Sequence, residues 1–121
     1  MPAPALVSVV DDDESVRESL PDLLKEFGFA AMTFASGETY LKSRYVKKTK
    51  CLILDVAMPG MSGPDVKRAL SERGVRIPII FITARADSLD AEARKGAVAC
   101  LLKPFNDTEL LEALKIAFET K

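Results

Sequence analysis

The stretch Cys51–Gly63, which reads CLILDVAMPGMSG, decides how the rest of the chain is interpreted. An apolar run leads directly into Asp55, and a Met-Pro-Gly turn then ends the extended segment. An ionised carboxylate is costly to remove from water. A buried strand that ends on an aspartate therefore needs a partner for that charge from another part of the chain.

The size and composition of the chain are those of an ordinary globular protein. It has 121 residues, of which 48% are hydrophobic and 29% charged, with a net charge of −1. This length favours a single domain over residues 1–121, and the near-neutral charge argues against direct binding of nucleic acid. No apolar stretch approaches the roughly 18 residues of a membrane span, and no signal peptide is visible. We therefore expect a cytoplasmic protein that does not bind a membrane.

The apolar pattern alternates between strand and helix along the whole chain. Short β-rich runs predict strands at 5–10, 30–35, 51–54, 78–83 and 99–102. Helical spacing, together with Pro64 in a first turn and an Asn106/Glu109 cap, predicts helices at about 16–27, around 41, 64–74, 87–95 and 106–118. Five strand–helix units in succession indicate an α/β fold with a doubly wound parallel sheet.

Polar residues stand where the predicted strands end. Asp11–Asp13 follow the first strand, Asp55 ends the third, Thr83 ends the fourth and Lys103 follows the fifth. Ligands of open α/β sheets bind beyond the carboxyl ends of the strands, near the point where the strand order reverses. If the first and third strands are neighbours, several carboxylates meet in one small space.

Such a carboxylate cluster is expensive unless a cation accompanies it. At ~4–5 Å and an effective dielectric constant near 20, each pair of like charges repels by roughly 3–4 kcal/mol, and three pairs would consume most of a stability of ~5–15 kcal/mol. A ligand set made of oxygen atoms suits Mg²⁺ or Mn²⁺. Asp55 could then attack a phosphoryl group, with the metal and Lys103 neutralising its oxygens.

Four segments of the sequence together resemble the response-regulator receiver domain of bacterial two-component signalling. They are VVDDDESVRESL, LILDVAMPGMSG, PIIFITARAD and CLLKPF, which occur in the family's order over nearly the whole chain. Their residues are most similar to those in the receivers of transcription factors that have a C-terminal helix-turn-helix. The resemblance implies a flavodoxin-like, five-stranded parallel sheet of order 2-1-3-4-5 with five helices.

The resemblance also implies roles at the carboxylate cluster. Asp55 would be the phosphoacceptor, Asp12 would bind Mg²⁺ directly and Asp11 through water, and the backbone carbonyl of Ala57 would complete the protein's ligands. The phosphoryl donor would be a phosphohistidine on a partner sensor histidine kinase, which fits a chain that has no histidine. The chain would then be a phosphorylation-dependent switch rather than an enzyme.

Two further residues would act on the phosphoryl group. Thr83 would donate a hydrogen bond to it, small Ala84 would leave room for it, and Lys103 would pair with one of its oxygens. The Lys103–Pro104 peptide bond would be cis, as in the family.

The resemblance places the output on the fourth helix, fifth strand and fifth helix. The partner there could be a C-terminal DNA-binding domain outside this chain, a second receiver or another protein. Homodimerisation through this face on phosphorylation is a hypothesis.

The chain departs from the family's usual pattern at Cys100. The family usually has Tyr or Phe where this chain has Cys100, which puts the coupling between that ring and the threonine in doubt. The resemblance also implies that Ala57 and Arg85 occupy positions that tune the lifetime of the phosphoryl group.

The two cysteines are expected to be buried free thiols, because Cys51 and Cys100 both lie in apolar runs. In the order 2-1-3-4-5 their strands are two spacings apart, about 9–10 Å. That separation is too large for a disulfide.

Two other functions compete with the receiver. Asp11-x-Asp13-x-Ser15 loosely fits the opening motif of a haloacid-dehalogenase-like phosphatase with Asp11 as the nucleophile. Against it, no acidic strand end follows Lys103, Asp55 would have no task, and Asp13 is better explained as favouring a helix N-terminus. A structural adaptor with an inactive site is a third alternative, which the complete set of expected site residues disfavours.

Overall fold

The protein folds around one parallel sheet. The structure, a computed structural model, describes residues 3–85, 89 and 91–119. Within these residues the strand order is β2-β1-β3-β4-β5, and all four strand pairs are parallel. The strands are β1 (Leu6–Val10), β2 (Ala30–Phe34), β3 (Thr49–Asp55), β4 (Ile79–Thr83) and β5 (Ala99–Leu102). The predicted doubly wound sheet and its order are confirmed.

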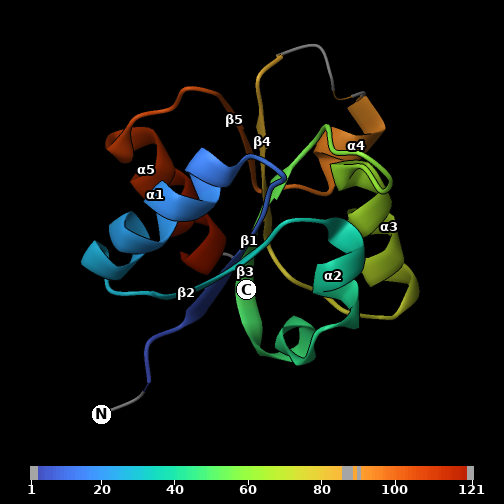
Figure 1. The fold of residues 1–121 in the computed structure, drawn as a ribbon, viewed down its shortest axis with the longest axis horizontal. Helices are drawn as coiled ribbons and strands as arrows, with labels where there is room; N and C mark the ends of the chain where they lie inside the picture. The colour runs from blue at the N-terminus through green and yellow to red at the C-terminus, as the bar shows by residue number, and fades with distance from the viewer. Residues whose placement is uncertain (1–2, 86–88, 90, 120–121) are drawn as a thin grey trace.

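Helices cover both faces of this sheet. The helices are α1 (Glu14–Glu26), α2 (Gly37–Lys42), the 3₁₀ helix η1 (Arg44–Lys48), α3 (Gly63–Glu72), α4 (Ala91–Lys95) and α5 (Asp107–Glu119). Figure 1 shows α1 and α5 on one face and α2, α3 and α4 on the other. The short helix η1 was not predicted. The helix predicted at 87–95 includes residues 87, 88 and 90, which lie outside the described residues.

The core is divided into two layers because successive strand residues point to opposite faces. In β3, Leu52 and Leu54 pack with α2 and α3, whereas Cys51 and Ile53 pack with α1 and α5. All four side chains are fully buried. This two-sided burial explains the continuous apolar run that leads to Asp55.

Local capping sets where the helices begin. The carboxylate of Asp13 accepts the backbone N–H of Ser15 at the start of α1, so its predicted place at a helix N-terminus is confirmed. The predicted cap of α5 is also confirmed, because Asn106 and Glu109 each accept the other's backbone N–H. Among the described residues, no helix combines the length and apolar character that a bilayer crossing requires.

The expectation for the cysteines is half wrong. Cys51 is a buried free thiol, but Cys100 is exposed. Because β5 is the edge strand of the sheet, its residues alternate between partial burial and exposure. An apolar run alone does not show that both faces of an edge strand are covered.

Candidate functional site

Backbone hydrogen bonds between neighbouring strands continue past the strand ends. Beyond β1, the N–H of Asp11 donates to the carbonyl of Phe34 on β2 at 3.1 Å. Beyond β5, the N–H of Lys103 donates to the carbonyl of Thr83 on β4 at 2.7 Å. The parallel ladders therefore continue into the residues that follow the strands and fix their positions relative to one another.

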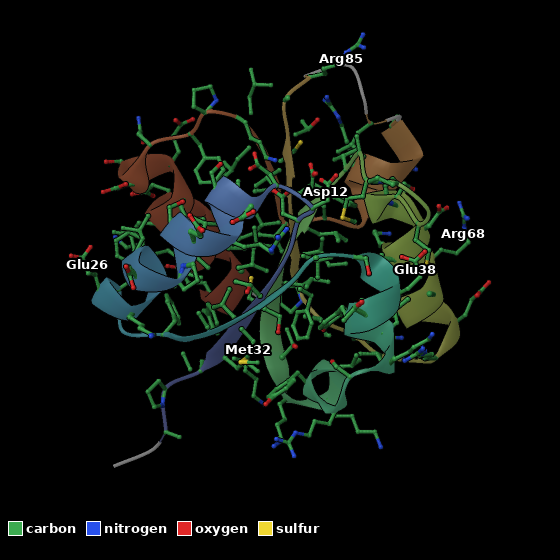
Figure 2. The ribbon with its side chains drawn as sticks, in the orientation of Figure 1. Asp12, Glu26, Met32, Glu38, Arg68 and Arg85 are labelled. Carbon is green, nitrogen blue, oxygen red and sulfur yellow. The ribbon has the colours of Figure 1, made fainter. Side chains whose placement is uncertain are left out.

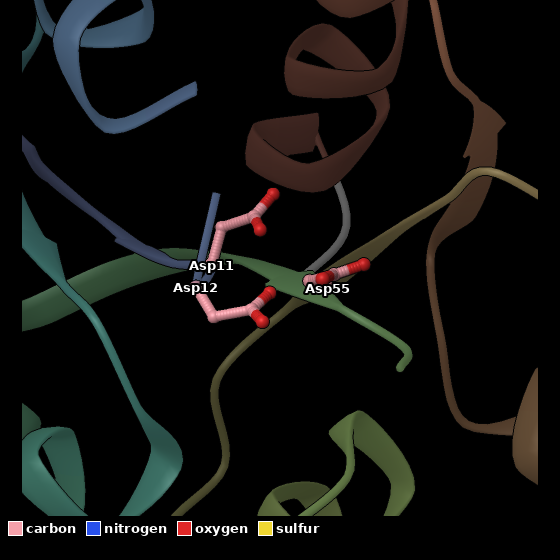
Figure 3. A group of neighbouring side chains, drawn as sticks. All are labelled: Asp11, Asp12 and Asp55. Carbon is pink, nitrogen blue, oxygen red and sulfur yellow. The ribbon is translucent and has the colours of Figure 1, made fainter. Parts of the chain in front are cut away.

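Three carboxylates converge at this edge of the sheet. Asp11 and Asp12 come from the end of β1 and Asp55 from the end of β3, as Figure 3 shows. One oxygen from each lies within 4.8 Å of the others. Asp11 is fully buried, Asp55 is 5% exposed, and Asp12 is open to solvent. The sequence-based prediction that these acids meet in space is confirmed.

Lys103 is the cation that the structure places beside the cluster. Its Nζ donates to Oδ2 of Asp11 at 2.7 Å and lies 3.6 Å from Oδ1 of Asp55. The other oxygen of Asp11 accepts the backbone N–H of Asp13 at 2.9 Å. The Lys103–Pro104 peptide bond is cis, as expected.

The environment changes the proton affinities of Asp55 and Lys103 in the same direction. Burial, with the negative charge of Asp11 second, raises the pKa of Asp55 to about 7, although Lys103 opposes this effect. Partial burial acts to lower the pKa of Lys103, but its hydrogen bond to Asp11 and the attraction of both carboxylates outweigh burial and raise the pKa. Lys103 therefore stays charged beside an aspartate that ionises reluctantly.

The donor set fits a hard divalent cation. The three acids offer carboxylate oxygens, without histidine or thiolate, and the exposed side of Asp12 leaves room for water ligands. Burial is the largest cause of the raised pKa of Asp55, and the negative charges of Asp11 and Asp12 add to it; a bound cation would offset that added charge. Ala57, whose carbonyl is the expected fourth ligand, lies two residues after Asp55 and is exposed.

Thr83 is the last residue of β4, the strand next to β3. It is 2% exposed, and its hydroxyl oxygen accepts the backbone N–H of Arg85 and donates to the Arg85 carbonyl, both at 3.1 Å. The side chain of Arg85 projects outward from the molecule, as Figure 2 shows. The hydroxyl is thus engaged by the backbone of the segment that follows β4.

Sequence reasoning missed two residues that support the site. Nη1 of Arg17, in α1, donates to the backbone carbonyl of Asp11 at 2.9 Å. Glu38, in α2, accepts the backbone N–H of Met61 in the loop after β3. The position of Arg17 in the first turns after the acidic run was an available signal. Nothing in the sequence connects Glu38 with Met61.

The geometry of the site argues against the phosphatase alternative. Both oxygens of Asp11, its proposed nucleophile, are taken by Lys103 and by the backbone N–H of Asp13. The carboxylate of Asp13 is directed at Ser15 of its own helix. Asp55, which that alternative leaves without a task, is buried at the centre of the site.

Comparison with known proteins gives a consistent result. Residues 7–115 match the family model of the response regulator receiver domain. Nodulation protein W of Bradyrhizobium diazoefficiens is 44% identical over 117 residues, which cover 95% of this chain and 52% of that protein. The chain spans about half the length of the curated relatives it matches.

Solved structures agree with the sequence matches. The response regulator StyR superposes with a TM-score of 0.89 at 43% identity, covering 97% of this chain and 60% of that one. The response regulator protein TrrA of Thermotoga maritima, in complex with Mg²⁺-BeF, superposes with a TM-score of 0.81 at 33% identity, covering 91% of this chain and 96% of that one. These matches give no support to the phosphatase alternative.

Proposed function

The chain belongs to the response-regulator receiver family, whose members act in phosphorylation-dependent signalling, and we propose that it performs this function by accepting a phosphoryl group on Asp55. The observation that carries the proposal is the convergence of three carboxylates and Lys103 at the carboxyl edge of the sheet. Nucleophile, counter-charge and cation ligands are then within reach of one another.

We propose Mg²⁺, or Mn²⁺ in its place, as the cofactor. Asp12 would hold it directly and Asp11 through water, with Asp55 and the backbone carbonyl of Ala57 as the remaining protein ligands. When bound, the ion would neutralise the carboxylates and the negative oxygens of the transferred group.

Asp55 would act as the nucleophile. One of its carboxylate oxygens would form a bond to phosphorus while the bond from phosphorus to the imidazole nitrogen of a phosphohistidine breaks. The phosphohistidine would belong to a partner sensor histidine kinase in the cytoplasm. The ammonium of Lys103, 3.6 Å from Asp55, favours the ionised carboxylate that this attack requires.

Lys103 and Thr83 would recognise the product. Lys103 is already close to both buried carboxylates and would pair with a phosphoryl oxygen. The hydroxyl of Thr83 would leave the backbone of Arg85 and donate to the phosphoryl group. This exchange would free the backbone of Arg85 from Thr83 and so link the chemistry to a change of shape.

The change would be transmitted by α4, β5 and α5. Its recipient would be an output partner, with a C-terminal DNA-binding domain outside this chain as the candidate that fits those relatives that are named transcriptional regulatory proteins. The chain itself would neither contact nucleic acid nor bind a membrane. Its own chemistry would be limited to taking up and losing the phosphoryl group.

Phosphorylation at Asp55 can be tested directly. The protein is incubated with Mg²⁺ and acetyl phosphate, and the adduct is measured by intact mass and located by borohydride trapping and peptide mapping. We expect one phosphoryl group on Asp55, the same result for Asp13→Asn, and none for Asp55→Asn. Label on Asp11 would instead favour the phosphatase, and the absence of label would favour an inactive adaptor.

A further inference from the structure

The start of α2 lies against the loop that follows β3. This loop, residues 56–62, connects Asp55 to α3 and contains Ala57. It is closed at its base, because the N–H of Gly63 donates to the carbonyl of Val56 at 2.8 Å. Its middle contacts α2 through Glu38, whose side chain lies in this region in Figure 2.

Glu38 binds the loop backbone with one oxygen and keeps the other buried. Its Oε2 accepts the N–H of Met61 at 3.3 Å. Its Oε1 is buried and has no hydrogen-bond partner among the described residues. A side chain at Gly60 would collide with this carboxylate, because a Cβ there would lie 2.6 Å from Oε2. The carboxylate is therefore packed tightly against the loop.

The packing of the neighbouring residue shows that this approach is built into the fold. A Cβ at Gly37 would overlap Cγ2 of Val66 on α3 and would lie 3.4 Å from Cβ of Met61. Gly37 thus allows the first turn of α2 to reach both the loop and α3. A buried carboxylate oxygen without a donor is costly, so the fold bears a cost at Glu38 for which a role at this loop would give a reason.

We propose that Glu38 is a positioning residue for the metal site. By holding the N–H of Met61, it fixes the loop that presents the carbonyl of Ala57, and so sets the affinity for Mg²⁺ without touching the ion. The proposal rests on the proposed function, because it uses Ala57 as a ligand. Coupling must be reciprocal, so Mg²⁺ should in turn protect the amide of Met61 from hydrogen exchange.

Two substitutions at Glu38 distinguish the effect of side-chain length from the effect of side-chain charge. Glu38→Gln loses the charge but keeps an oxygen at the same distance, whereas Glu38→Asp keeps the charge but is one methylene shorter. We expect Glu38→Asp to weaken Mg²⁺ binding by about tenfold, as changes in residues that orient ligands do. Glu38→Gln should stay close to the wild-type affinity. Glu26→Gln, at an exposed position on α1, is the matched control (Figure 2).

Mg²⁺ affinity is measured by titration calorimetry on the unphosphorylated protein, together with the melting temperature and the exchange rate of the Met61 amide. Glu38→Asp should accelerate exchange at Met61, and Glu38→Gln should not. Weaker Mg²⁺ binding in Glu38→Gln than in Glu38→Asp would show that charge acts, and would overturn the proposal. A lower melting temperature with unchanged Mg²⁺ affinity in both variants would also overturn it, by showing a purely structural role.

The wild-type protein distinguishes failure of the inference from failure of the function. If it binds Mg²⁺ and is labelled on Asp55, but the two Glu38 variants behave alike, the inference alone is wrong. If the wild-type protein does not bind Mg²⁺, both are wrong.

Discussion

Asp55 combines two properties that are usually kept apart, a buried position and a need to ionise. It is 5% exposed and has Asp11 and Asp12 as neighbours, so burial and like charge raise its pKa to about 7. The ordinary pKa of an aspartate in an unfolded chain is about 3.9. Between these two values the folded protein binds a proton that the unfolded chain has lost.

This difference predicts the pH dependence of stability in a buffer with EDTA. The proton on Asp55 favours the folded state below about pH 4, and this contribution is lost as the pH rises toward 7. We expect the free energy of unfolding to fall over that interval by on the order of 4 kcal/mol more in the wild type than in Asp55→Asn. Urea denaturation at a series of pH values measures it. Parallel curves for the two proteins would contradict a raised pKa of Asp55 in the folded state.

Mg²⁺ should reverse this loss of stability. A ligand that binds the folded state at ten times its dissociation constant adds about 1.4 kcal/mol. We expect this gain above pH 7 in the wild type and little of it in Asp12→Asn, which removes the direct ligand. Urea denaturation with and without Mg²⁺ provides the comparison, with Ca²⁺-free buffers throughout. Equal gains in both proteins would place the ion elsewhere.

The two cysteines should differ in reactivity. Cys51 is fully buried, and burial raises its pKa to about 12, whereas Cys100 is exposed, with a pKa raised by partial burial that the charge of Arg94 opposes. Because the thiolate is the reactive form, we expect iodoacetamide at pH 8 to label Cys100 in the native protein and both thiols after unfolding. Intact mass counts the labels, and native Cys100→Ser should take none.

At the scale of elements, the junction between β3 and α3 determines where Asp55 points. The N–H of Gly63 bonds to Val56, and Ser62 and Asp65 form a capping box that begins α3 immediately afterwards. A Cβ at Gly63 would lie 2.5 Å from the backbone oxygen of Asp55 and 3.0 Å from Cα of Val56. The close approach of α3 to the end of β3 therefore requires glycine.

Gly63→Ala should accordingly destabilise the fold. The atoms that the new methyl group meets belong mainly to the backbone and cannot rotate away, so we expect a loss of about 1–3 kcal/mol. Ser71→Ala, on an exposed position of α3, should stay within about 0.5 kcal/mol of the wild type. Urea denaturation of the three proteins measures both effects. A neutral Gly63→Ala would show that the strand and helix can separate without cost.

At the scale of the whole molecule, Lys103 connects the site to the proposed output surface, because it directly follows β5. Among the described residues, the large apolar side chains with the greatest exposure are Leu102 on β5, at 49%, and Ile116 on α5, at 48%. Scattered exposed apolar residues are common. These two nevertheless lie on the elements that the proposed function assigns to the output.

A homodimer formed on activation would bury part of this surface. We expect beryllofluoride with Mg²⁺ to raise the molar mass measured by light scattering toward that of a dimer, and Leu102→Glu to prevent the increase. Shielding of β5 should also slow alkylation of Cys100 in the activated wild type. An unchanged molar mass at high protein concentration would count against the homodimer. It would not bear on the proposal that Asp55 is phosphorylated.

Much of this protein was predictable from local patterns. The period of the apolar residues, the Asn106 cap and the polar residues at the strand ends are all local patterns. The sequence by itself therefore determined the strands, the helices other than η1, the parallel sheet and the identity of the clustered acids.

Other properties were decided only by the tertiary structure. The exposure of Cys100 depends on β5 being an edge strand, and the contact of Glu38 with Met61 depends on how closely α2 approaches the loop after β3. The raised pKa of Asp55 depends on burial and on charges from another strand. Burial, distance and electrostatic interaction are properties of the packed chain, which no local pattern contains.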